Sequence, residues 1–321
     1  MIFGNIGWKR CGLAVAVMCL SSAVAMLLTS YAAQNVNDSQ SKEKSVQALD
    51  QLRGKYAAIN SVHLVADAKV SIYGVNGTGT FEYWAEDKRY KIKSHTDKHL
   101  GFKTDVDVAY DGKRFHYFDR GSGILSYRKQ DEITSQAALP NPLFLPVDYL
   151  SNDDDDCPLC ALRLLDLKSQ NVRWDNRARD LEVKSKRQDT KTGEIISDVE
   201  MPGGKSDKRS FKLRVRMSGP AEENVRPIQI ERIASDGKVI LSLTFDDFMQ
   251  NSLVPHPRRI SINAFDNEGN LALKLEYTVR TLEINQPIDR STFTINFDEA
   301  EGVWDSDEKR FVKEKPPKTS D

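Results

Sequence analysis

Apolar and polar residues alternate along most of the chain between residues 64 and 128. At positions 64–72 the even-numbered residues are Leu, Ala, Ala, Val and Ile, whereas the odd-numbered residues include Asp67 and Lys69. Because successive side chains of a β-strand point to opposite faces of a sheet, this period of two indicates strands with one apolar and one polar face. The segment predicts about six short antiparallel strands joined by tight turns.

The same alternation returns after residue 180 and is interrupted there by Asp-Gly and Glu-Gly turn pairs. Strands are expected at 181–186, 211–217, 228–234, 239–248, 258–265, 271–284 and 293–297. Residues 188–209 are polar and predict a long excursion at a hairpin tip, and 298–321 predict a charged C-terminal tail. A sheet of about twelve strands curls rather than staying flat, so we expect one domain, residues 45–297, built on one curved antiparallel sheet.

Two segments depart from the strand pattern and are expected to cover the apolar face. Apolar residues spaced by three or four predict a helix from Ser45 to about Asn60, after a flexible lead-in at 33–44. Residues 137–150 (AALPNPLFLPVDYL) are strongly apolar, but their three prolines exclude a regular helix or strand. This segment is either a lid over a binding site or an ordinary core plug.

The N-terminal segment has the order of a secretory signal. Lys9 and Arg10 precede an apolar run at 11–28, and the small residues Ser30 and Ala32 follow. This pattern predicts a signal peptide, residues 1–32, and a periplasmic or otherwise exported protein of the cell envelope. The alternative is an uncleaved inner-membrane anchor at 11–28, since that run approaches the length that spans a bilayer.

Two of the four cysteines, Cys157 and Cys160, lie beyond the signal segment and form a Cys-x-x-Cys motif. Dithiol catalysts need a lowered thiol pKa, but the acidic run at 153–156 opposes thiolate formation. An oxidising compartment favours a structural disulfide between Cys157 and Cys160 over redox catalysis.

Apart from the Cys-x-x-Cys motif, composition and motifs give little sign of an enzyme. Lys and Arg total 46 against 47 Asp and Glu, so nothing indicates a nucleic-acid partner. No nucleotide-binding glycine loop, GxSxG or HExxH motif occurs. His95 and His99 lie in a predicted polar loop with no third ligand, which favours a solvated loop over a metal site. We expect no enzymatic activity, catalytic residue, metal or other cofactor.

The apolar face of the sheet is the remaining candidate for function. About twelve strands present a large surface, against which the sequence offers few covering elements. This shortfall predicts a cavity, although a filled core is the alternative. The candidate ligand-binding residues are Val70, Ile72, Phe81, Tyr83, Tyr90, Ile92, Val108, Tyr110, Phe115, Tyr117 and Phe144.

Several motifs, taken in order, resemble one family. The first is the leading helix followed by Ile59-Asn60-Ser61-Val62, and the second is the turn Gly77-Thr78-Gly79 before Phe81 and Lys88-Arg89. The third is the hairpin from Tyr110 to Tyr117, and the fourth is the segment from Leu282 to Phe297, which precedes Gly302-Val303. Over roughly Val46 to Val303 the chain resembles the LolA/LolB-like lipoprotein carriers of the bacterial envelope.

The resemblance implies a mainly β protein with a few helices, whose curved antiparallel sheet forms an open half-barrel with a helical or loop lid. It also implies that the half-barrel holds acyl chains of lipids or lipoproteins. Arg89 matches the arginine that fastens the lid in the family, although Tyr90 follows it where the family has proline. We therefore expect a non-enzymatic, lipid-binding carrier or sorting protein in the periplasm that serves lipoprotein transport. The alternative is an envelope sensor or protein-interaction module that binds envelope membrane proteins.

Overall fold

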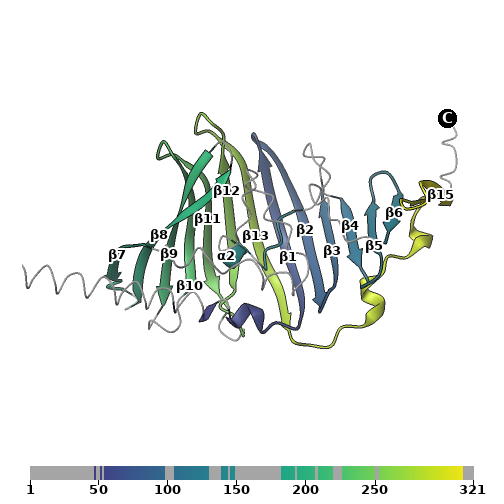
Figure 1. The fold of residues 1–321 in the computed structure, drawn as a ribbon, viewed down its shortest axis with the longest axis horizontal. Helices are drawn as coiled ribbons and strands as arrows, with labels where there is room; N and C mark the ends of the chain where they lie inside the picture. Colours follow the sequence, from purple (N-terminus) through teal and green to yellow (C-terminus); the bar gives the residue numbers. More distant parts are fainter. Residues whose placement is uncertain are drawn as a thin grey trace, which may run out of the picture.

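A computed structural model describes most of the sheet and its connections (Figure 1). The described residues are 47, 51–52, 54–97, 105–129, 139–143, 145–148, 182–191, 194–206, 209–219, 226–249 and 253–313. The predicted signal segment 1–32, the lead-in 33–44, Phe144, Cys157 and Cys160 lie outside these ranges.

Two runs of consecutive strands and one C-terminal pair build the sheet. The first run contains β1 (Ser61–Ile72), β2 (Val75–Glu86), β3 (Arg89–Thr96), β4 (Val106–Tyr110), β5 (Phe115–Asp119) and β6 (Ile124–Arg128). The second contains β7 (Glu182–Gln188), β8 (Ile195–Ser206), β9 (Arg209–Gly219), β10 (Arg226–Ala234), β11 (Val239–Phe248), β12 (Pro257–Phe265) and β13 (Leu271–Ile284). The pair is β14 (Gly302–Asp305) and β15 (Arg310–Lys313).

All of these strands belong to one sheet. Its order is β15-β14-β6-β5-β4-β3-β2-β1-β13-β12-β11-β10-β9-β8-β7. The first strand of the first run, β1, pairs antiparallel with the last strand of the second run, β13, and this pairing joins the two runs. Val62 lies opposite Ile284, and Ile72 lies opposite Leu273. Only β14 and β6 pair in parallel among the described strands. The sheet is curved and does not close, so the prediction of a mainly β, open half-barrel fold is confirmed (Figure 1).

The predicted leading helix lies against one face of the sheet. Residue 47, residues 51–52 and residues 54–57 are helical, and Leu52, Tyr56 and Ile59 are buried in the core. The spacing of the apolar residues thus correctly predicted that these three side chains face the core. Within the described ranges, no helix has the length and apolar composition needed to cross a membrane.

Each face of the sheet has its own hydrophobic cluster. The larger one, here called the inner cluster, covers β1–β5 and β8–β13 together with the leading helix and residues 139–145. The smaller outer cluster lies on the opposite face and contains Ala109, Phe118, Leu125, Ile295, Ala300 and Val303. The inner face is therefore the apolar face that the alternation predicts, and part of the opposite face is also covered.

The C-terminal part and the polar excursion differ from expectation. Residues 195–206, predicted within the excursion, form β8, which pairs with both β7 and β9. The predicted strand at 293–297 is wrong. It is replaced by two 3-10 turns, η4 (Arg290–Phe293) and η5 (Phe297–Glu299), because Asp289 and Asn296 cap them through their side chains. The predicted tail contains β14 and β15, since β14 finds a partner in β6.

Candidate functional site

The structure brings the predicted ligand-binding residues together on the inner face. Phe81, Tyr83, Tyr90, Ile92 and Val70 are fully or almost fully buried in the inner cluster. The other described members of the predicted set lie in or against the same cluster, namely Ile72, Val108, Tyr110, Phe115 and Tyr117. Their role in binding a ligand stays a prediction, but their common face is established.

Aromatic side chains of neighbouring strands pack against each other on this face. The rings of Phe81 on β2 and Tyr277 on β13 meet edge to face with centroids 6.1 Å apart. Tyr90 on β3 and Tyr110 on β4 lie 5.9 Å apart at a tilted angle. Such pairs add to the energy of apolar burial and fix the positions of large side chains. The inner face is thus a pre-arranged apolar surface.

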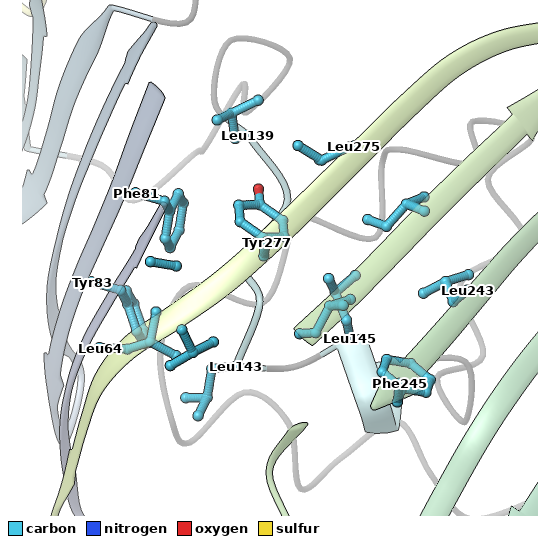
Figure 2. Packing of buried hydrophobic residues seen from close by; sticks show 14 of the residues in the cluster. Leu64, Phe81, Tyr83, Leu139, Leu143, Leu145, Leu243, Phe245, Leu275 and Tyr277 are labelled. Atoms are coloured by element: carbon cyan, nitrogen blue, oxygen red, sulfur yellow. The ribbon is translucent and has the colours of Figure 1, made fainter. Parts of the chain in front are cut away.

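Residues 139–143 and 145–148, here called the plug, cover the centre of the inner face. Leu139, Leu143 and Leu145 are buried and point toward side chains of β1, β2, β11 and β13 (Figure 2). The segment ends in a single helical turn, α2 (Leu145–Asp148). The expectation that the proline-broken apolar segment covers the sheet therefore agrees with the structure, which holds it packed against the core.

Side chains of the sheet, and of the segment that leads into β12, form hydrogen bonds with the backbone of the plug. The hydroxyl of Tyr277 donates to the Pro140 carbonyl over 2.6 Å, and Nε2 of His256 donates to the Pro142 carbonyl over 3.3 Å. The Leu139 amide donates to the hydroxyl of Ser94 over 3.4 Å. These bonds satisfy backbone groups that β-sheet pairing would otherwise satisfy.

Burial sets the ionisation of two of these groups. Desolvation lowers the pKa of His256 to about 4. Desolvation also raises the pKa of Tyr277 well above its ordinary value. At neutral pH both side chains are therefore uncharged donors. The buried carboxylates among the described residues, Asp107 and Asp305, belong to the outer face. The inner site thus offers apolar contact and neutral polar groups, which suit hydrocarbon.

Arg89, the predicted lid contact, is the first residue of β3. It forms an ion pair with Glu86, and its guanidinium lies 5.1 Å from the centre of the Phe293 ring. A contact between Arg89 and a lid stays a prediction.

The outer face carries a charged network around one buried carboxylate. Asp107 on β4 pairs with His95 over 3.1 Å and with Arg120 over 2.5 Å, and Arg120 also reaches Glu299 over 3.4 Å. The hydrogen bond with Asp107 raises the pKa of His95. Burial alone would raise the pKa of Asp107, but the bonds from His95 and Arg120 outweigh it and lower that pKa. No group suited to a metal ion occurs among the described residues.

Three residues of the inner site were not predicted as site residues from the sequence: Ser94, His256 and Tyr277. Tyr277 lies on the apolar positions of a predicted strand, so its alternation with Glu276 and Thr278 could have indicated it. His256 and Ser94 act on backbone groups of a segment far away in the chain, and no local signal indicates such partners.

Comparison with known proteins gives distant structural likenesses only. Neither a family model nor a curated protein matches the chain. A LolA superfamily protein from Nitrosomonas europaea is similar at 11% identity over 77% of this chain and 97% of that one, with a TM-score of 0.41. A DUF1329 family protein from Desulfovibrio piger covers 80% and 97% of the two chains at 9% identity, with a TM-score of 0.46.

A third similar structure, from Vibrio parahaemolyticus, is described as an outer membrane lipoprotein-sorting protein domain. It has 9% identity over 79% of this chain and 97% of that one, with a TM-score of 0.47. The similar structures thus include proteins of the kind that the sequence motifs resemble. At these identities and TM-scores the likeness supports no conclusion about function. A functional proposal therefore has to rest on the geometry of the inner face.

Proposed function

We propose that this protein is a non-enzymatic envelope protein that binds acyl chains of lipids or lipoproteins on its inner face, in a carrier or sorting role. The observation that supports this best is the plug. A short proline-broken segment covers the centre of a large apolar surface, and none of the described strand pairings includes it. A cover held by its leucines and a few hydrogen bonds can be displaced without breaking the sheet.

The energetics of exchange favour hydrocarbon as the competitor. Removing the plug exposes the aromatic and aliphatic side chains beneath Leu139, Leu143 and Leu145. An acyl chain gains about 0.8 kcal/mol for each buried methylene, so a chain of ordinary length offsets the loss of three leucine side chains. The freed carbonyls of Pro140 and Pro142 become hydrated once the plug reaches solvent.

The test is native mass spectrometry of protein isolated from the envelope, with a matched pair of variants. Tyr110→Asp places a charge on the inner face, and Trp84→Asp places one beside Lys93 and His63 on the outer face. We expect the natural protein and Trp84→Asp to carry extractable acyl lipid. Tyr110→Asp should fold, because Tyr110 is only partly buried and water can reach the new charge, but it should lose the lipid, because covering a charge with an acyl chain is costly. A lipid-free natural protein, or unfolding of Tyr110→Asp, would contradict the proposal.

Export to the cell envelope is part of the same proposal. Cleavage after Ala32 would give a protein that begins at Ala33, whereas an anchor at 11–28 would keep the full mass. The intact mass of protein recovered from the periplasm and from the inner membrane distinguishes the two forms.

Protein recognition is a second candidate function, supported by the β15 edge of the sheet. Phe311 and Val312 are exposed there on a strand whose described partner is β14 alone. Exposed apolar edge strands are templates for strand addition, whereas the opposite edge, β7, presents Lys184, Lys186 and Arg187. Phe311→Ser with Val312→Lys should abolish capture of an envelope partner and leave acyl lipid in place; capture that persists in this variant contradicts a role for the β15 edge.

A further inference from the structure

The inner cluster is closed at one end of the strands and reaches solvent at the other. At the closed end, Asn285 accepts a hydrogen bond from the Asn60 amide over 2.7 Å, and the Ser61 hydroxyl donates to the Gln286 carbonyl over 2.6 Å. Tyr56 and Ile59 of the leading helical region are buried here. In Figure 1 the helix lies at this lower end, opposite the β1–β2 turn.

At the other end the apolar face becomes progressively exposed along β13. Leu275 and Leu273 are 1% and 7% exposed. Beyond Leu273 a β-bulge interrupts the alternation, and Leu271, which pairs with Phe265, is 45% exposed at the start of β13. Val75 on β2 is opposite Ile72, which is opposite Leu273, so these side chains share the inner face. Val75 is 54% exposed. An apolar track of Leu273, Ile72 and Val75 therefore leads from the inner cluster to the end of the strands, where Leu271 is the next exposed apolar side chain.

The turn between β1 and β2 carries an aromatic side chain at an unfavourable position. Tyr73 and Gly74 both have positive φ, 44° and 84°, which is the conformation of a two-residue type I′ turn. Asn-Gly is the preferred sequence there, and a bulky residue at positive φ is uncommon. Yet Tyr73 is 71% exposed, and its amide donates to the Ala272 carbonyl over 2.9 Å, beside Leu271. The ring therefore gains little from burial within the protein.

We propose that Tyr73, Val75 and Leu271, here called the open rim, dock this protein on a lipid bilayer, so that acyl chains pass between membrane and inner face along the apolar track. This inference rests on the proposed function and adds the end of the half-barrel at which transfer takes place. Tyrosine is enriched at the membrane interface because its ring is apolar and its hydroxyl reaches the headgroups. Valine and leucine beside it enter the acyl region.

The charges beside the open rim indicate the kind of bilayer. A pocket of about 330 Å³ on the flank of the same strands is lined by groups that include Lys69, Asp97, Lys274 and Glu276. Lys274 and Glu276 pair over 2.8 Å. Cations and carboxylates thus occur together, which complements zwitterionic headgroups rather than a strongly anionic surface. Binding to the bilayer should therefore depend little on salt or on anionic lipid.

The test is flotation of the exported protein with vesicles of phosphatidylcholine and phosphatidylethanolamine. Tyr73→Asn with Leu271→Thr removes two rim side chains, and asparagine suits the type I′ turn, so the fold is preserved. The matched control is Leu253→Thr, which removes a side chain that is 61% exposed before the start of β12, at the closed end. We expect the rim variant to lower the partition coefficient at least tenfold, equivalent to about 1.4 kcal/mol. The control should leave the coefficient unchanged.

Equal loss in the rim variant and in Leu253→Thr, or no loss in either, would overturn the inference, as would binding that requires phosphatidylglycerol. All forms carry the same N-terminus, so an uncleaved anchor cannot produce a difference between them. Native mass spectrometry of the same samples separates this inference from the proposed function. If the protein carries acyl lipid but the rim variant floats as the natural protein does, only the docking role of the open rim is contradicted. If flotation depends on the rim but the protein never carries lipid, only the acyl-binding function is contradicted.

Discussion

The two faces of the sheet are each covered by a short segment, and the two segments are held by different interactions. The plug is held on the inner face by its leucine side chains, by hydrogen bonds that Tyr277 and His256 donate, and by one that Ser94 accepts. The outer cover, residues 289–305, pairs with the sheet as β14 and inserts Ile295, Ala300 and Val303 into the outer cluster.

This difference indicates which cover can leave its face. Removing the outer cover breaks a β-ladder and the hydrogen bond from Lys91 to the Thr294 carbonyl, and it uncovers the network around Asp107. Removing the plug breaks hydrogen bonds whose partners can turn to water, and an apolar ligand can replace its leucines. We therefore expect the outer cover to unfold only with the whole sheet, and the plug to open by itself.

The largest expected difference comes from a matched pair of apolar truncations. Ile295→Ala should lower the free energy of unfolding by about 2–5 kcal/mol, the usual cost of such a truncation in a core that cannot collapse. Leu143→Ala should cost about 1 kcal/mol, because the loss is limited by the free energy needed to open the plug. Urea denaturation measures both. Equal losses would show that the plug is a fixed part of the core.

Acid should weaken the plug but not the outer cover. The unfolded chain protonates His256 below pH 6.5, its ordinary pKa, whereas the folded protein does so only near pH 4. The folded state therefore loses stability as the pH falls between these values, by at most about 3 kcal/mol. His95 behaves in the opposite way, because its pKa is raised in the fold. Its contribution is present below pH 6.5 and is lost as the pH rises through the folded value.

The pKa of Asp107 in the outer network is shifted so that mild acid does not weaken this network. Its pKa is lowered in the fold, so its contribution is present above its ordinary value of 3.8 and disappears as the pH falls through the folded value. Between about pH 6 and pH 4.5 the outer network should be intact while the plug exchanges faster. Hydrogen exchange of the Leu139 and Leu143 amides measures this. His256→Gln retains a donor for the Pro142 carbonyl but does not titrate, so it should remove the acceleration; persistence of the acceleration would assign it to another group.

The inner face was more predictable from the sequence than the outer one. Alternation alone located Leu64, Phe81, Tyr90 and Val108 on one face, because each strand carries its own signal. The same rule assigned Asp107 to a solvated face, whereas the structure buries it. Its partner Arg120 comes from the connection after β5 and is joined by Glu299 from the far end of the chain, and tertiary contacts of this kind leave no local pattern.

The C-terminal part shows the same limit. Phe293, Ile295 and Phe297 alternate as a strand does, but the caps provided by Asp289 and Asn296 produce 3-10 turns. The four residues of β14 become a strand only because β6, far away in the sequence, offers a partner. For the candidate site, the sequence identified the sheet residues and the apolar cover, but not the hydrogen bonds that connect them.

A smaller effect should follow from removing one hydroxyl under each cover. Tyr277→Phe leaves the Pro140 carbonyl without its donor while the plug is closed, which should cost about 1 kcal/mol or less and speed the uptake of a fluorescent fatty acid. Tyr127→Phe removes the bond to Asp305 beneath the outer cover, 2.7 Å long, and should not change uptake. Faster uptake in both variants would mean that loss of stability, rather than opening of the plug, controls entry of the ligand.

The smallest effect is expected from the ion pair between Arg120 and Glu299 at the margin of the outer cover. Its atoms lie 3.4 Å apart, and the two side chains are 34% and 49% exposed, so solvent and salt screen the attraction. Glu299→Gln should therefore change the free energy of unfolding by less than about 0.5 kcal/mol and leave lipid uptake unchanged, since β14 and the outer cluster still hold the segment. The difference from the natural protein should vanish in high salt. A loss that persists in high salt, together with faster hydrogen exchange in β14, would show that this exposed pair rather than the β-ladder keeps the outer cover in place.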